Sequence, residues 1–139
     1  MHDVGRLALT VVEPARYSNL ILEAEGKALN VLDRERELFG VDHCEAGSWL
    51  AEQWKLPPHF AEVAAHHHEP CKPGKVDMVS LVQVACRLAD CIGFSAVRPL
   101  NPLSFDSILL ELPSAAHKRL AFDQSELTFK VAMKINSVE

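Results

Sequence analysis

The sequence predicts an all-α protein, and three observations support this fold class. Apolar residues recur three and four positions apart along nearly the whole chain, which is the period of an amphipathic helix. No run alternates apolar and polar residues with the β-branched enrichment of a strand. Prolines, glycines and helix-capping residues divide the chain into segments of helical length. With 139 residues, the chain is long enough for one hydrophobic core and too short for two independent ones.

Five helices are expected in the first half of the chain. Pro14 and Pro58 each suit the first turn of a helix, because a proline has no N–H group to leave unpaired there. Gly40 suits the left-handed position that follows a helix, and Asp42 with Glu45 three residues later has the spacing of a capping box. The expected helices cover residues 4–12, 14–26, 28–39, 42–55 and 58–68.

The second half is expected to begin with a loop at residues 70–75, which read PCKPGK. Asp77 caps the most apolar helix of the chain, and Gly93 ends it. Asp123 and Glu126 form another capping pair at the start of the last helix. The expected segments are a helix at 78–92, a looser stretch at 95–102, short helices at 105–112 and 114–120, and a final helix from 123.

Composition excludes several classes of partner. The formal net charge is −5 and no block of Lys and Arg occurs, which disfavours a nucleic-acid or anionic-membrane surface. No run approaches the roughly 18 apolar residues of a membrane span, and the N-terminus lacks the basic and apolar regions of a signal peptide. The four cysteines have no CxxC spacing and three of them lie in helical patterns. Reduced thiols in a cytoplasmic protein are therefore expected.

Helical periodicity indicates which histidines face the interior. His43 begins a largely apolar stripe of the helix at 42–55, and Gly47 one turn later allows another backbone to approach closely. The stripe consists of His43, Gly47, Leu50 and Trp54. In the helix at 58–68, His67 lies on the apolar face, His68 borders it, and His66 lies on the polar face.

The residues alone leave two interpretations of the inward histidines open. They are either ordinary buried histidines with hydrogen-bond partners, or part of a set of imidazole and carboxylate ligands for Zn, Mn or Fe. Asp90 is equally open, since it shares a polar helix stripe with Ser80, Gln83 and Arg87. That stripe is either solvent-exposed, with Asp90 paired to Arg87, or it faces a cavity within a helix that is apolar around most of its circumference.

Four segments, taken in order, resemble the HD superfamily of metal-dependent phosphohydrolases. The segments are HDVGRLAL at 2–9, FGVDHCEAGSWLAEQWKLP at 39–57, AAHHHEP at 64–70 and VACRLADCIG at 84–93. The second closely resembles the HDOD branch, the HD-related output domain of bacterial signalling proteins. The resemblance implies an HD-like helical core over residues 1–95, and we expect residues 96–139 to form a C-terminal helical subdomain packed on it.

The resemblance also implies a set of site residues. The implied ligands of a divalent metal (Mn, Fe, Zn or Mg, unless the ion has been lost) are His2, Asp3, His43, His67, His68 and Asp90. Asp3 would bridge two ions if two bind, and would orient the nucleophile in an active enzyme. Arg6 stands where relatives carry a Lys or Arg that can face a phosphate. His66 is not among the implied ligands.

Two functions follow from the resemblance. The first is a regulatory domain of a signal-transduction protein, whose His/Asp pocket binds a metal structurally or is vestigial. The alternative is a metal-dependent phosphohydrolase acting on a nucleotide or another phosphoester. The segment PCKPGK stands where cyclic-di-GMP phosphodiesterases have a Gly-Tyr-Pro loop, which disfavours that activity.

A partner is also expected. The chain begins at the His-Asp motif, so the first helix of the family is expected to be missing. Its loss would expose the apolar side of residues 4–12, and exposed apolar patches usually bind a partner. We therefore expect a homo-oligomer or a protein partner at the N-terminal region, and neither nucleic acid nor membrane.

Overall fold

The computed structural model describes the whole chain except residues 28, 72–75, 95–96, 98–100, 113–122 and 138–139. The described residues contain helices and no strand, which confirms the all-α prediction. The helices are α1 (Val4–Val12), α2 (Pro14–Gly26), α3 (Val31–Phe39), α4 (His43–Gln53), α5 (Pro58–His66), α6 (Met78–Cys91), α7 (Phe105–Leu110) and α9 (Gln124–Asn136).

Local capping chemistry sets most of these boundaries. Helices α1 and α2 have the predicted bounds, and the full capping box of Asp42 and Glu45 begins α4. Gly40 ends α3 in the left-handed conformation, with φ of 79°. Helix α3 begins three residues later than predicted, because the Asn30 side chain accepts a hydrogen bond from the Asp33 N–H and caps the helix there.

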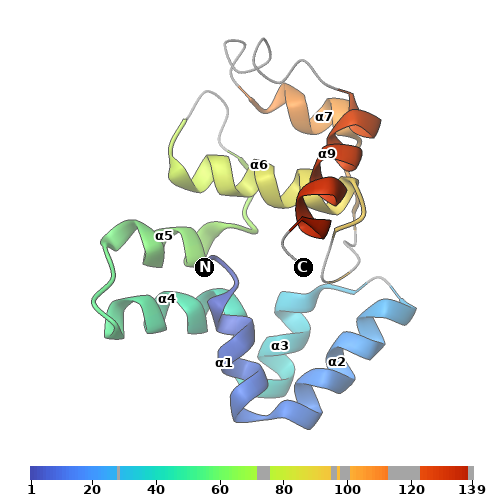
Figure 1. Cartoon of the computed structure of the whole chain (residues 1–139). Coiled ribbons are helices and arrows are strands. Elements are labelled where there is room, and N and C mark those ends of the chain that lie inside the picture. The colour runs from blue at the N-terminus through green and yellow to red at the C-terminus, as the bar shows by residue number, and fades with distance from the viewer. Residues whose placement is uncertain (28, 72–75, 95–96, 98–100, 113–122, 138–139) are drawn as a thin grey trace.

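Helices α1 and α5 both pack closely on α4. Helices α4 and α5 are antiparallel neighbours, and α1 crosses the start of α4 (Figure 1). The crossing is tight at Gly5, where an added Cβ would lie 1.9 Å from the carbonyl oxygen of His43. The predicted close approach at Gly47 is confirmed from the other side, since a Cβ there would lie 3.2 Å from the Gly5 nitrogen.

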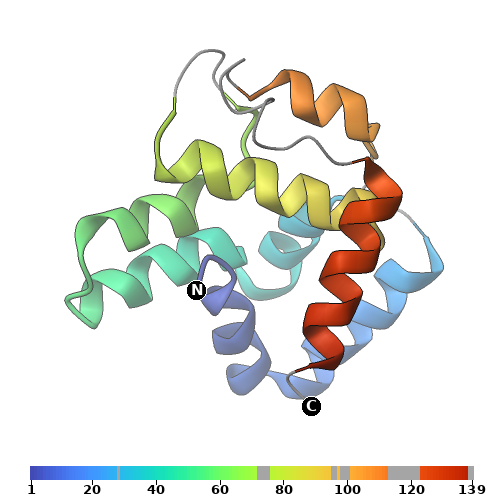
Figure 2. The same ribbon diagram turned by 45° about the horizontal axis from the view of Figure 1, so that its top comes forward.

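Two further packing regions complete the fold. Leu9, Tyr17 and Leu20 form a buried cluster between α1 and α2, with Leu38 and Phe39 of α3 packed against it. Helix α6 lies between α5 and α7 in both views (Figures 1 and 2). None of the helices that the structure describes combines the length and apolar character needed to cross a membrane.

The stripe predicted for α4 is wrong at its C-terminal end. Trp54 is 55% exposed, because it follows the last helical residue of α4. The buried face instead rotates by one position toward α5. It consists of His43, Cys44, Gly47 and Ala51.

The polar stripe of α6 is not solvent-exposed at its middle positions, Gln83 and Arg87. Gln83 is only 3% exposed, and its amide donates to the carbonyl oxygen of His66 over 2.7 Å. Arg87 donates to the carbonyl oxygen of Glu69 over 2.8 Å and forms an ion pair with Glu111. Gln83 and Arg87 are therefore covered by the turn after α5 and the end of α7, which agrees at these two positions with the alternative that the stripe faces cavities.

The C-terminal part of the prediction is only partly within the described residues. Helix α7 packs on α6 and buries Phe105 and Ile108, and the Gln124 side chain donates to the carbonyl oxygen of Cys91 over 3.1 Å. The expected helix at 114–120 and most of the stretches at 70–75 and 95–102 lie outside the described residues. The division of the chain at residue 95 stays a prediction.

Candidate metal centre

Four side chains from separate segments meet where α1 crosses the α4–α5 pair. Asp3 precedes α1, His43 is the first residue of α4, and His67 and His68 follow α5 directly. Asp3 Oδ1 lies 3.4 Å from His43 Nε2 and 3.3 Å from His67 Nε2. His68 Nε2 lies 3.0 Å from His43 Nε2. We call Asp3, His43, His67 and His68 the His/Asp cluster.

Packing between neighbouring helices places these residues close together. The contact between the two glycine-bearing helices brings the N-terminal end of α1 against the first turn of α4. The turn after α5 then returns to the same point, and Gln83 of α6 holds that turn through the carbonyl oxygen of His66. His43 and His67 are 0% and 3% exposed, which confirms that both face the interior.

The Nδ1 atoms of two of these histidines, which point away from the centre of the cluster, already have hydrogen-bond partners. His43 Nδ1 lies 2.6 Å from the carboxylate of Glu35, and His67 Nδ1 lies 2.9 Å from the carbonyl oxygen of Ala64. Both partners are acceptors, so each Nδ1 carries a proton, and in the neutral form of each ring Nε2 then presents a lone pair to the centre. Buried His67 Nε2 makes no hydrogen bond with any residue that the structure describes.

This arrangement fits a divalent cation. Two ligands held about 2.1 Å from one ion at angles of about 90–110° lie ~3.0–3.4 Å apart. Three separations within the His/Asp cluster, from Asp3 to His43, from Asp3 to His67 and from His43 to His68, run from 3.0 to 3.4 Å. His43 and His67 each donate Nδ1–H to an acceptor, which is the second hydrogen bond that is usual for a metal-bound imidazole.

A thiol extends the set of potential ligands. The ligand atoms of His43, Cys44, His67 and His68 all lie within 4.8 Å of one another. Cys44 Sγ lies 3.9 Å from His67 Nδ1, the nitrogen that faces Ala64 and not Asp3. Burial, followed by the charges of nearby carboxylates, raises the pKa of Cys44 to about 12, which keeps the thiol protonated. Of the two sets, the His/Asp cluster offers its ligand atoms without the loss of a thiol proton.

The charge distribution favours an ionised carboxylate at the centre. Burial acts to raise the pKa of Asp3, but polar contacts with His2 and His67 and the charge of Arg6 outweigh it and hold the pKa well below its usual range. Arg6 Nε donates to Asp3 Oδ1 over 2.9 Å. Burial, followed by the charges of the neighbouring imidazoles, lowers the pKa of His68 to about 3.

His2, Arg6 and Asp90 lie around the His/Asp cluster. His2 Nε2 is 3.1 Å from Asp3 Oδ2, and this hydrogen bond, followed by one with Cys86, raises the pKa of His2 to about 9. His2 is thus a cation that donates to Asp3. Asp90 lines the same cavity of about 770 Å³ as these residues. The roles of all six residues as ligands stay predictions.

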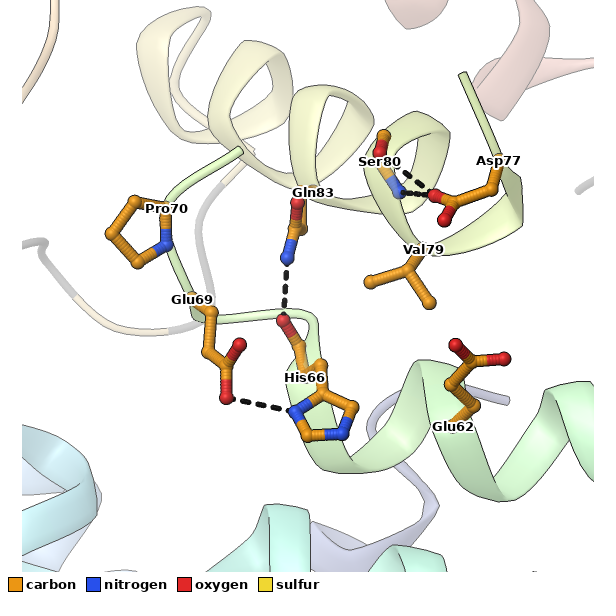
Figure 3. A pocket seen from close by; sticks show the side chains of 8 residues that line it. All are labelled: Glu62, His66, Glu69, Pro70, Asp77, Val79, Ser80 and Gln83. Carbon is orange, nitrogen blue, oxygen red and sulfur yellow. Dashed lines mark hydrogen bonds and ion pairs between the residues drawn. The ribbon is translucent and has the colours of Figure 1, made fainter. Parts of the chain in front are cut away.

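His66 points into a different depression (Figure 3). This smaller pocket, of about 130 Å³, lies between the end of α5 and the start of α6, and Glu62, Asp77 and Gln83 help to line it. His66 Nδ1 lies 2.7 Å from Glu69 Oε1 at its edge. The triple histidine therefore divides between two sites.

Sequence reasoning missed Glu35. It is fully buried and lies behind His43. The available signal was its place on the stripe of α3 that also carries Val31 and Leu38, four residues before and three after. Cys44 was interpreted only as a reduced thiol, although it adjoins His43.

A protein-family model described as the HDOD domain matches residues 1–70. This match covers half of the 139 residues. The chain belongs to the HDOD domain family. The matched part of this HDOD domain contains the whole His/Asp cluster and ends before Asp90. No curated protein and no solved structure matches the chain.

Proposed function

We propose that this HDOD domain is a regulatory domain that holds a divalent metal ion in its His/Asp cluster. The observation that carries the proposal is the convergence of three imidazoles and the Asp3 carboxylate, with the outer nitrogens of His43 and His67 already held by other acceptors. Membership of the HD-related output-domain family supports the regulatory part.

The residues of the cluster would act by joining separate segments. Asp3 belongs to the N-terminal segment, His43 to α4, and His67 to the turn that follows α5. A bound divalent ion supplies the positive charge that offsets the carboxylate and links these segments, so that its binding free energy adds to the stability of the fold. Metal occupancy would in this way set how firmly α1 is held on α4 and α5.

Metal binding tests this proposal directly. We expect the purified chain to bind one equivalent of Zn²⁺ or Mn²⁺ in calorimetry and to unfold at a higher temperature with the ion present. His43→Ala and His67→Ala should abolish both effects. His66→Ala is the matched control, because its ring lies in the other depression (Figure 3). Absence of binding in the wild type, or equal loss in the control, would refute the proposal.

A metal-dependent phosphohydrolase is the second candidate, and the cavity beside the cluster favours it. The cavity, of about 770 Å³, is large enough for a nucleotide-sized ligand, and cationic His2 and Arg6 help to line it. Arg6 Nη1 has no hydrogen-bond partner among the described residues, and the positive charge of Arg6 at the cavity wall favours a phosphoryl group there. A divalent ion in such a site activates water and neutralises phosphoryl charge.

Turnover separates the two candidates. A panel of nucleotides and simple phosphomonoesters, assayed with Mn²⁺ and Mg²⁺, gives no turnover if the domain is only regulatory. Turnover that disappears in Asp3→Asn favours the enzyme. Activity that is unchanged in Asp3→Asn comes from a contaminant and counts against the enzyme.

A further inference from the structure

Glu35 is a charged residue in a position where the fold needs only an apolar one. It lies on the inner stripe of α3 and is 0% exposed. Burial of an ionised carboxylate is costly unless hydrogen bonds compensate it. Such a residue calls for an explanation in terms of what it contacts.

The carboxylate of Glu35 has three polar contacts, and two are to one residue. Glu35 Oε2 accepts from the backbone N–H of His43 over 2.9 Å and lies 2.6 Å from His43 Nδ1. Glu35 Oε1 accepts from the hydroxyl of Tyr17 over 3.0 Å. Tyr17 is itself only 5% exposed, so the chain of contacts from α2 through α3 to α4 is closed to solvent.

The double contact fixes both the position and the tautomer of the His43 ring. The backbone N–H belongs to the first residue of α4 and has no acceptor within the helix. The same oxygen holds the ring through Nδ1, so the ring cannot rotate without breaking that hydrogen bond. With the proton on Nδ1, the lone pair of Nε2 faces Asp3 and His68.

We propose that Glu35 is the positioning residue of the His/Asp cluster, and that Tyr17 orients Glu35 in turn. The inference rests on the proposed metal binding, and it adds a requirement: the affinity for the ion depends on a carboxylate of α3 that touches no ion. Loss of a partner behind a metal-bound histidine typically weakens metal binding by about 10–100-fold.

A role in supporting the fold alone predicts different behaviour. A carboxylate that only caps α4 would affect stability and leave the ring free to adopt either tautomer. A positioning residue fixes the tautomer of His43 before any ion is present. The metal-free protein therefore provides a readout that does not depend on metal binding.

The first experiment uses ¹⁵N NMR of the imidazoles in the full chain with chelator present. We expect His43, assigned with a His43→Gln variant, to show a single tautomer with the proton on Nδ1. Glu35→Met retains a side chain of similar length but offers no acceptor, and should give a mixture of tautomers. Wild-type His43 with its proton on Nε2, or an unchanged ring in a folded Glu35→Met, would overturn the proposal.

The second experiment measures Zn²⁺ affinity by competition with a chelating dye. Glu35→Met should bind about 10–100-fold more weakly than the wild type. Glu35→Gln keeps an acceptor and should recover most of the lost affinity. Glu37→Gln, on the exposed side of the same helix, is the matched control and should bind normally. If Glu35→Met does not fold, the wild-type tautomer and Glu35→Gln still decide the question. Glu35→Gln keeps a hydrogen-bond acceptor for His43, so a loss of Zn²⁺ affinity as large as that of His43→Ala would contradict a positioning role for this acceptor.

The proposed metal binding and the positioning role of Glu35 can be refuted independently of each other. A wild-type chain that binds no Zn²⁺ refutes the proposed metal function, whatever the tautomer of His43. A Glu35→Met variant that folds and binds Zn²⁺ with wild-type affinity leaves metal binding intact and refutes the positioning role.

Discussion

The crossing of α1 and α4 leaves less room for an added methyl group at Gly5 than there is at Gly40, Gly47 or Gly93. In Gly5→Ala, the new Cβ would lie 1.9 Å from the His43 carbonyl oxygen and 2.7 Å from the Gly47 nitrogen. Real Cβ contacts are almost never below 3.0 Å, so the two backbones must separate by at least about 1.1 Å. Neither neighbour is a flexible side chain that could move aside.

The free-energy cost follows from this separation. Overpacking in a well-packed interior costs about 1–3 kcal/mol, and a clash with backbone belongs at the upper end of that range. Replacing glycine within a helix returns about 0.5–1 kcal/mol. We expect Gly5→Ala to lower the free energy of unfolding by about 2 kcal/mol, or the melting temperature by roughly 5–10 °C.

The same substitution should weaken metal binding. Asp3 is two residues from Gly5 and lies 3.3–3.4 Å from the Nε2 atoms of His43 and His67. A binding constellation must be held to within about 0.5 Å, which is less than the required displacement. Zn²⁺ affinity should therefore fall by at least about tenfold, measured at a temperature where the variant remains folded.

Gly47→Ala is the matched control. Its added Cβ would lie 3.2 Å from the Gly5 nitrogen and 3.4 Å from Ala64 Cβ, so shifts of a few tenths of an ångström accommodate it. The helix-propensity gain is the same in both variants, and the difference between them isolates the clash. If Gly5→Ala unfolds at the same urea concentration as Gly47→Ala and retains full Zn²⁺ affinity, the close crossing inferred here is refuted.

Three further predictions concern other parts of the molecule. Tyr17 is the sole tyrosine of the chain, and burial, opposed by Arg6 and reinforced by Glu35, raises its pKa above the usual range. Ultraviolet titration should therefore show ionisation of Tyr17 at a higher pH in the native protein than in urea. The free energy of unfolding should fall as the pH rises above about 10, where only the unfolded state ionises. Asp42→Ala removes the cap of α4 and should cost about 1 kcal/mol in urea denaturation; an unchanged midpoint would contradict the capping box. Leu7 and Val11 are 67% and 80% exposed on α1. We propose that they contact a second copy of the chain. Light scattering should then find a dimer that Leu7→Ser weakens, and a monomer at high micromolar concentration would contradict this.

The parts of the fold that sequence reasoning predicted correctly depend on contacts within a few residues. The N-terminus of α4 is determined by Asp42 and Glu45, and the end of α3 by Gly40. The inward direction of His43 and His67 follows from helical period alone, because each sits one or two turns from small or apolar residues on the same face. These features needed no knowledge of which helices pack together.

The parts that were missed or left open depend on what lies opposite a residue in space. The polar stripe of α6 was left open between solvent and a cavity because nothing within that helix reveals that the turn after α5 and the end of α7 cover Gln83 and Arg87. Trp54 looked buried because the stripe continues past the point where its helix ends. Burial at a helix end is a tertiary property that periodicity does not carry.

Glu35 shows the same limit with a consequence for function. A glutamate in a charged helix is read as a surface residue, since an ionised carboxylate is rarely buried without partners. Its partners here are Tyr17, eighteen residues earlier, and His43, eight residues later in the next helix. Because these partners lie against Glu35 only in the folded chain, the sequence does not reveal that they compensate the free-energy cost of its burial. A buried carboxylate behind an inward histidine is therefore a more specific sign of a metal centre than the histidine itself, because it also fixes the orientation of the ring that a metal ligand needs.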